Sequence, residues 1–326
     1  MIGLIAFLAT LAAAGAVPRL PSTAYRLPAA SVGRLVSTFS IVARDTENGD
    51  LGVAVQSKFP NVRAVVPFAR AGVGAVATQS FVNSDFGTRG LKLLELGATP
   101  QEVLGIVSRD DPELEQRQVG IVDAKGRAAT FTGRQCFAWA GGRSGPDYAI
   151  QGNVLVSEQT VAAMEKAFLG TKGPLADRLL AAIKSGADAG GDRRGRQSAA
   201  LLVVRNGGSY DGKGDAYIDI SVFDARDPIA EIFRLYKLQK IHFQRSDPND
   251  VVPIEGNDAK FLQKLLVRKG FLKSGRTDGV WDEASTQALA DYMAWENYDT
   301  RIRRDGRIDK TILKLIREKE AEVPIP

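Results

Sequence analysis

Three apolar segments of the chain each border a Gln-Ser pair, and this recurrence constrains the fold more than any other feature of the sequence. The pairs and their apolar segments are Gln56-Ser57 after residues 51–55, Gln79-Ser80 after residues 72–78, and Gln197-Ser198 before residues 199–204. A short apolar run between polar residues is typical of a buried strand. Polar pairs at the ends of three such strands would suit one shared site, so we expect these strand ends to come together.

The third pair ends a charged stretch, residues 191–198, that leads directly into a buried strand. Two glycines, Gly191 and Gly195, flank Asp192 and two arginines there. Glycine allows a positive φ or a close approach of the backbone to a ligand. One interpretation is a solvated basic loop before a core strand, and the other is part of a binding site.

Composition indicates a globular protein and disfavours several function classes. The 326 residues suggest two domains, and 44% hydrophobic and 25% charged residues are ordinary values. The formal net charge is +5. The basic residues form no stripe interleaved with aromatic residues, which argues against nucleic-acid binding. A mildly basic surface would suit an anionic polymer such as a cell wall.

Cysteine and histidine each occur once, as Cys136 and His242. No intramolecular disulfide can form, and metal sites built on pairs of these residues are excluded, so we expect neither a metal nor a cofactor. A Ser-His-Asp triad would need His242, around which no acid–nucleophile pattern occurs. Cys136 lies in an apolar run and is expected to be a small core residue.

The first residues have the character of a targeting segment. Residues 1–16 are almost wholly apolar and end in the small residues Ala14-Gly15-Ala16, which predicts a signal peptide and a secreted or periplasmic protein. The segment is short for a membrane span. Residues 17–36 contain three prolines and are interpreted as a linker or pro-segment.

Strands and helices then alternate in blocks. We expect helices from residue 86 to 97, from Thr99 onward with Pro100 and Glu102 in a capping box, and at 159–168, 175–185 and 228–241. Strands are expected at residues 38–45, 51–58, 64–68, 72–78, 119–123, 128–132, 149–156, 199–204 and 218–222. This order fits an α+β fold with helices on both faces of two stacked antiparallel sheets.

A polar break at residues 246–250 precedes a more charged region, which we interpret as a small all-α domain over residues 250–326. Helical spacing is expected at 260–266, 282–295 and 309–319, with a turn at 277–281.

Four blocks of the first region, residues 38–45, 72–79, 115–120 and 190–201, resemble the DUF1028 family. The resemblance covers residues 37–245. That family is placed in the N-terminal nucleophile (Ntn) hydrolase superfamily, so the resemblance implies a four-layer αββα sandwich.

The second region is similar to the peptidoglycan-binding domain often attached to this family. The similarity rests on Leu262-Gln263-x-Leu265 and on Asp278-Gly279-Val280-Trp281. A helical scaffold without a ligand is the alternative interpretation.

An Ntn hydrolase attacks an amide with the side chain of the first residue of a strand, whose free α-amine is the general base. The resemblance makes Thr38 the nucleophile. An α-amine has a pKa near 8, so a useful fraction is neutral at pH 7. Thr38 follows 37 residues, and the mechanism therefore requires cleavage between Ser37 and Thr38. Without that cleavage Thr38 is only a strand residue.

The supporting roles are expected at other strand ends. Lys58 would lower the pKa of the Thr38 hydroxyl, while Gln79 and Asn153 would donate hydrogen bonds to an oxyanion. Asp192 would orient the free amine, with Ser198 and Arg196 completing the polar network. Arg193 or Arg194 would bind a substrate carboxylate. Each of these residues has a structural cap or surface position as its alternative.

Three functions remain open at this point. The first is a secreted amide-bond hydrolase that acts on a small amide or peptide and is tethered to peptidoglycan by its tail. The second is a cell-wall-binding protein with a non-catalytic sandwich. The third is a small-anion-binding protein that uses Arg193, Arg194 and Arg196. Association into a homo-oligomer is left open.

Overall fold

The fold is described from a computed structural model, in which residues 35–36, 38–273 and 277–321 are described. The predicted signal peptide lies outside these residues, as does the predicted linker except for its last two residues. Among the described residues, no helix combines the length and apolar character needed to cross a membrane.

Two antiparallel sheets form the centre of the first region. One sheet has the order β1-β5-β6-β7, with β4 also paired to β5, and the other has the order β11-β10-β3-β2-β9-β8. The strands of the first sheet are β1 (Leu35–Val36), β4 (Pro67–Arg70), β5 (Gly74–Phe81), β6 (Arg117–Asp123) and β7 (Ala128–Thr132). Those of the second are β2 (Thr38–Arg44), β3 (Leu51–Ser57), β8 (Gly141–Gly145), β9 (Tyr148–Gly152), β10 (Ser198–Val204) and β11 (Ala216–Val222).

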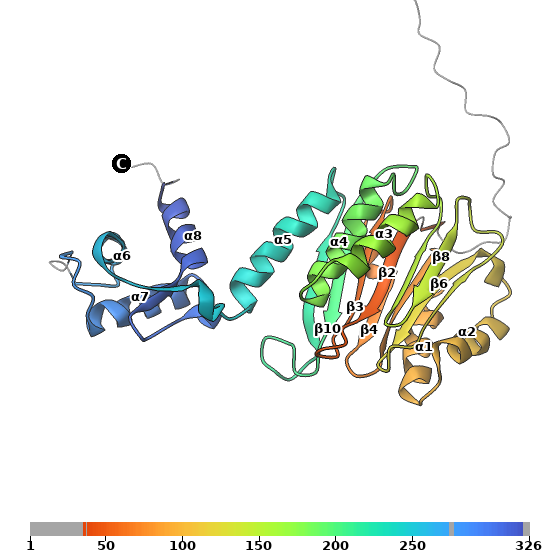
Figure 1. Cartoon of the computed structure of the whole chain (residues 1–326), viewed down its shortest axis with the longest axis horizontal. Coiled ribbons are helices and arrows are strands. Elements are labelled where there is room, and N and C mark those ends of the chain that lie inside the picture. Colours follow the sequence, from red (N-terminus) through yellow and green to blue (C-terminus); the bar gives the residue numbers. More distant parts are fainter. Residues whose placement is uncertain (1–34, 37, 274–276, 322–326) are drawn as a thin grey trace, which may run out of the picture. The chain divides into compact units, whose positions relative to one another are not determined.

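Helices cover the outer face of each sheet, as Figure 1 shows. The first sheet carries α1 (Asp85–Glu95) and α2 (Pro100–Arg109). The second carries α3 (Gln159–Gly170), α4 (Leu175–Asp188) and α5 (Pro228–Phe243). The layers follow the order helices, sheet, sheet, helices, which confirms the expected α+β class and its four-layer arrangement. Fully buried apolar residues, among them Phe39, Val55 and Ile121, fill the spaces between the layers.

Local signals placed several elements correctly. The Thr99 side chain accepts from the backbone N–H of Glu102, whose carboxylate accepts from the N–H of Thr99, so the predicted capping box is present. Gly97, with φ of +100°, ends α1 as expected.

Several elements differ from expectation. The segment expected as a strand at 64–68 contains the end of a short 3-10 helix, η1 (Val62–Ala64), and β4 begins only at Pro67. Strand β8 was missed because its sequence, Gly-Gly-Arg-Ser-Gly, has no apolar alternation. Close packing against the neighbouring strand requires glycine here, because a Cβ on Gly142 would lie 2.8 Å from the Ile150 carbonyl oxygen.

The second region contains α6 (Gly256–Arg268), α7 (Glu283–Trp295) and α8 (Lys310–Ala321), with the short 3-10 helices η3 (Pro248–Asp250) and η4 (Asp299–Arg301). The structure adds a two-stranded sheet of β12 (Val251–Pro253) and β13 (Arg307–Asp309) to this otherwise helical region. Leu262, Leu266, Leu289, Tyr292 and Ile312 form its buried core.

Gln263 explains why the two motifs of the second region occur together. Its Oε1 accepts from the N–H of Gly279 at 2.8 Å, and its Nε2 donates to the carbonyl of Val280 at 2.9 Å. The side chain is fully buried. The glutamine of one motif therefore fixes the turn formed by the other.

Candidate functional site

Three hydroxyl residues lie side by side where β2 begins. Thr38 pairs in register with Ser57 of β3, and Ser57 pairs with Ser198 of β10. The Thr38 hydroxyl donates to Ser57 Oγ at 3.0 Å. Ser198 Oγ donates to the carbonyl of Phe59 at 2.5 Å and so fixes the turn that follows β3. All three hydroxyl residues are fully buried.

The backbone carbonyl of Thr38 is the meeting point of two predicted site residues. Gln79 Nε2 donates to this oxygen at 3.2 Å, and the backbone N–H of Asn153 donates to it at 3.0 Å. Gln79 comes from the first sheet, whereas Asn153 directly follows β9 of the second. The fold thus brings both residues to Thr38, although 41 residues separate Gln79 from it in the chain.

Gln118 joins the two amides. Its Oε1 accepts from Gln79 Nε2 at 2.8 Å and from Asn153 Nδ2 at 2.9 Å. Its own Nε2 donates to the carbonyl of Gly152 at 2.8 Å, which crosses from one sheet to the other.

Ser40 and Gln151 extend this network along β2. Ser40 Oγ donates to Gln79 Oε1 at 2.6 Å and accepts from Gln151 Nε2 at 2.6 Å. A Cβ on Gly120 would lie 2.0 Å from Gln151 Oε1, so this glycine provides the space for that amide. We call Ser40, Gln79, Gln118, Gln151 and Asn153 the amide cluster; all five are fully buried.

The sequence analysis did not assign Gln118 and Gln151 to the site. The available signal was a glutamine within an otherwise apolar strand, since a buried polar side chain needs hydrogen-bond partners and points to others nearby. Asn153 can accept a further hydrogen bond, because among the described residues its Oδ1 has no partner.

The charged stretch is organised differently. We call residues 191–196 the arginine loop. The carboxylate of Asp192 accepts from the backbone N–H of Lys58 at 3.2 Å and from Arg194 Nη2 at 2.9 Å. Arg194 Nη2 also donates to the carbonyl of Lys58 at 3.2 Å. Asp192 and Arg194 therefore join this loop to the end of β3.

The other two arginines bind separate backbone carbonyls. Arg193 Nη2 donates to Leu155 at 3.1 Å, and Arg196 Nη2 donates to Ala187 at 2.9 Å. All three arginines are exposed, yet each has a partner within the protein. Lys58 is exposed, and among the described residues no hydrogen bond or ion pair of its ammonium group is found. The roles predicted for Lys58, Asp192 and the three arginines stay predictions.

Strained backbone occurs at two strand ends near Thr38. Ser80, near the end of β5, has φ of +66°, and Val154, directly after Asn153, has φ of +54°. A positive φ is unusual for any residue with a Cβ, and more so for a β-branched one. Such strain persists only where the surrounding structure holds it, and it is common at functional sites. Ser80 is fully buried.

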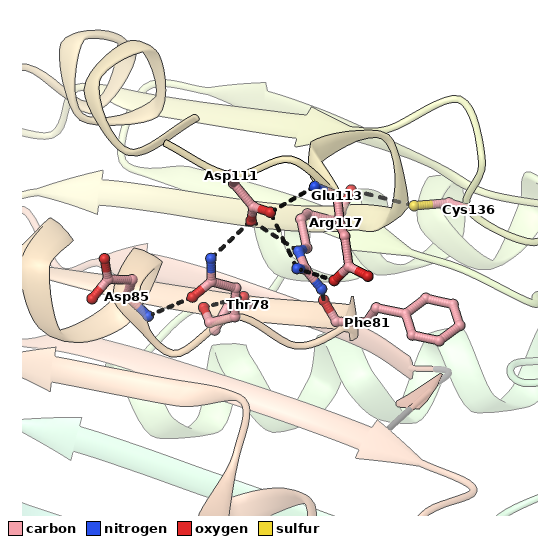
Figure 2. A network of polar contacts seen from close by, with 8 residues as sticks. Thr78, Phe81, Asp85, Asp111, Glu113, Arg117 and Cys136 are labelled. Carbon is pink, nitrogen blue, oxygen red and sulfur yellow. Dashed lines mark hydrogen bonds and ion pairs between the residues drawn. The ribbon is translucent and has the colours of Figure 1, made fainter. Parts of the chain in front are cut away.

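A buried ion-pair network holds the end of β5 (Figure 2). Arg117, paired in register with Ser80, donates from Nη1 to the carbonyl of Phe81 at 2.8 Å. Its guanidinium also contacts Asp111 at 2.9 Å and Glu113 at 2.7 Å. Burial acts to lower the pKa of Arg117, but hydrogen bonds to these two carboxylates outweigh it and leave that pKa above its usual value.

Asp111 and Cys136 complete the view in Figure 2. Burial acts to raise the pKa of Asp111, yet hydrogen bonds from Arg117 and Asn83 hold it below its usual value. Cys136 Sγ donates to the carbonyl of Arg117 at 3.3 Å, and burial raises the pKa of its thiol. A thiol in that state is a poor nucleophile. Cys136 is only partly buried, however, so the expectation of a core position was wrong.

Thr38 itself is closed off as the structure stands. Its relative exposure is 0%, so a substrate can reach its hydroxyl only after neighbouring residues move. Strand β1, which ends two residues before Thr38, is one such neighbour.

Comparisons with known proteins agree with this architecture. Residues 38–232 match the model of a "Family of unknown function (DUF1028)", and residues 242–316 match that of a "Putative peptidoglycan binding domain". A search of curated proteins found no match. The chain is similar to the crystal structure of protein SPO2555 from Silicibacter pomeroyi, assigned to DUF1028, with 27% identity and a TM-score of 0.57. That similarity covers 63% of this chain and 89% of the other.

Proposed function

The chain belongs to the DUF1028 family, whose function is unknown, and we propose that it is an amide-bond hydrolase whose nucleophile is Thr38, freed at its amine by cleavage before it. A peptidoglycan-binding domain follows the family region and suggests association with the cell wall. Export to the periplasm or the outside of the cell belongs to the same proposal.

One observation supports the catalytic proposal above all others. A network of buried side-chain amides from both sheets lies next to a single threonine at the first position of a strand, and Gln79 Nε2 and the backbone N–H of Asn153 donate to the backbone carbonyl of that threonine. Burying amide groups costs free energy unless they are hydrogen-bonded. Apolar residues at these positions would form a purely structural interface without that desolvation cost.

The chemistry uses one residue as both base and nucleophile. Once the bond before Thr38 is cut, its neutral α-amine accepts the hydroxyl proton, and Oγ attacks the substrate carbonyl. The acyl group is then esterified to Oγ, and the leaving amine takes the proton from the ammonium group. Water, deprotonated by the same amine, hydrolyses the ester to a carboxylic acid and restores the hydroxyl.

The amide cluster supplies the polar groups that this sequence needs. We assign the stabilisation of the oxyanion to Asn153 Nδ2, which is positioned by Gln118, and to Gln79 Nε2, which would turn one N–H from the Thr38 carbonyl to the oxyanion. The unpaired Asn153 Oδ1 is a candidate acceptor for the new ammonium group. Ser57 orients the Thr38 hydroxyl. Asp192 and Ser198 would act indirectly by fixing the segment that includes Lys58.

A defined N-terminus tests the proposal. A chain that begins at Thr38, released from a fusion by a site-specific protease, should hydrolyse members of a panel of small amides and peptides. Thr38→Ala in the same chain should lower the rate by about 10³-fold or more, because the nucleophile is lost. Equal rates for the two chains would overturn the assignment.

The uncut chain provides the matching control. Protein that begins near Val17 should be inactive, because its Thr38 nitrogen is part of an amide. Hydrolysis by such a chain, with its N-terminus verified by mass spectrometry, would exclude the α-amine as the base. A native chain found to begin at Thr38 would support the required processing.

The wall-binding part of the proposal has a separate test. The full chain should sediment with purified peptidoglycan, whereas a chain that ends at Ser246 should remain in the supernatant. Equal sedimentation of the two would contradict a wall-binding role for residues 247–326.

A further inference from the structure

Strand β1 lies on the acyl side of the bond whose cleavage would free Thr38. It pairs antiparallel with β5, with Val36 opposite Ser80 and Leu35 opposite Phe81. Thr38 then begins a strand of the other sheet. The residues two and three positions before the Ser37–Thr38 bond are therefore held as an extended strand on β5.

The pairing occupies a limited part of one strand edge. One edge of β5 is paired with β6 along residues 74–80, and its other edge is shared by β4 and β1. Strand β4 pairs with residues 74–77 of that shared edge, and β1 pairs with Ser80 and Phe81. Among the described strands, β1 alone pairs with this edge at Ser80 and Phe81, so its departure would leave a short open stretch beyond the end of β4.

The open stretch would be rigid. Arg117 holds the carbonyl of Phe81 and is itself held by Asp111 and Glu113, as Figure 2 shows. Ser80 has a strained backbone and is fully buried. A preorganised strand edge binds an extended peptide by main-chain hydrogen bonds.

We propose that β5, at Ser80 and Phe81, is the binding site for the acyl side of a peptide substrate, which takes the place of β1. The inference rests on the proposed nucleophile: the carbonyl that Oγ attacks in a substrate must lie within reach of Oγ, next to the amine that cleavage leaves on Thr38. The acyl side of the substrate would then extend along the strand edge that residues 35–36 occupy before cleavage. The substrate class is thus a peptide with at least three residues before the cleaved amide, rather than an isolated small amide.

The test compares two coumarin amides on the chain that begins at Thr38. One carries acetyl-Leu-Val-Ser, the residues that precede Thr38 in this chain, and the other carries acetyl-Ser alone. We expect kcat/KM for the longer amide to be at least tenfold higher, because only it can pair with β5. Equal values would overturn the strand site and leave the hydrolase proposal intact.

N-methylation provides a matched control within the ligand. Neighbouring residues of a strand direct their N–H groups to opposite sides. Two versions of the longer amide are methylated, one at the leucine nitrogen and one at the valine nitrogen. Only one of the two should therefore lose the increase in kcat/KM. Equal effects of the two methyl groups would contradict strand pairing.

A binding measurement separates this inference from catalysis. Acetyl-Leu-Val-Ser-amide is titrated against a Thr38→Ala chain that begins at position 38, with the two methylated peptides beside it. Suppose that the peptide binds, that only one of the two methyl groups abolishes binding, and that the parent chain with Thr38 hydrolyses no substrate. This result would support the strand site and overturn the hydrolase proposal. If the peptide does not bind and no substrate is hydrolysed, the strand site and the hydrolase proposal are both overturned.

Discussion

The amide cluster and the arginine loop were both candidate sites in the sequence, but the structure uses them in different ways. In the amide cluster, uncharged side chains from two sheets are fully buried and form one hydrogen-bonded network, from which Gln79 donates to the Thr38 carbonyl. In the arginine loop, the three arginines are exposed, Arg193 and Arg196 bind separate backbone carbonyls, and Arg194 pairs with the buried carboxylate of Asp192. The more conspicuous sequence feature is thus the one with the simpler structural explanation.

The difference follows from the cost of desolvation. A buried amide must find partners inside the protein, so several amides gather in one network. An arginine at the surface keeps its solvation and binds whichever carbonyl is near. Convergence of buried uncharged groups is therefore the stronger indication of a site in this chain.

The largest contrast is expected between Gln79→Leu and Arg196→Ala in the chain that begins at Thr38. Gln79→Leu removes a donor to the Thr38 carbonyl and the partner of Gln118, so turnover should fall by about 10²–10³-fold. Arg196→Ala should change kcat by less than about twofold. Steady-state kinetics on one amide substrate would measure both. Similar losses would remove the distinction between the two regions.

Stability should distinguish the regions in a second way. Asp192→Ala removes the carboxylate that accepts from the N–H of Lys58 and from Arg194, and should lower the free energy of unfolding by about 1–3 kcal/mol. Asp188→Ala is the matched control, since its pair with Lys184 is exposed on both sides, and its effect should stay below about 0.5 kcal/mol. Urea denaturation would report both values. A small effect of Asp192→Ala would mean that the loop holds itself by other contacts.

The ion-pair network of Figure 2 extends the comparison because its arginine, Arg117, is buried, whereas the arginines of the arginine loop are exposed. The pKa of Asp111 is lowered in the folded protein, so its contribution to stability is present above the unfolded pKa of about 4 and is lost as pH falls through the folded value. Melting temperatures between pH 6 and pH 2.5 should therefore fall less steeply in Asp111→Asn than in the parent.

Asp110→Asn is the control for that experiment, because Asp110 forms an exposed pair with Arg89 and its side chain is 68% exposed. Its acid profile should follow that of the parent. If Asp111→Asn and the parent lose stability in parallel, the network makes no contribution that depends on pH.

The smallest effect is expected for Arg193→Ala. This side chain is exposed and binds one carbonyl, so the free energy of unfolding should change by no more than about 0.5 kcal/mol. Calorimetric titration with phosphate should show equally weak binding before and after the change. A phosphate affinity that is lost with Arg193 would instead favour the small-anion function.

Local patterns were enough to predict most elements of the sandwich. Apolar runs located β2, β3 and β10, and capping residues located the start of α2. Strand β8 could not be predicted, because its glycines are required by the close approach of neighbouring strands rather than by any local preference. The class and the layers followed from the order of elements and from the family resemblance.

The candidate site was predictable in part. Thr38, Gln79 and Asn153 were named from their places at strand ends, and they do lie together. Gln118 and Gln151 were missed because their importance depends on which strands face each other across the two sheets, and one sequence does not show this. The sequence also gave no sign that residues 35–36 pair with β5, because a two-residue strand has no periodicity.

The hydrogen bonds from Ser40 to Gln79, from Gln79 to Thr38 and from Asn153 to Gln118 all cross from one sheet to the other. Two hydrocarbon faces can slide over each other by a fraction of an ångström at little cost, because dispersion has no preferred direction. Directional bonds resist that shear. The lateral alignment of the two sheets around Thr38 is thus fixed by polar groups, and it would persist after the residues that precede Thr38 had gone.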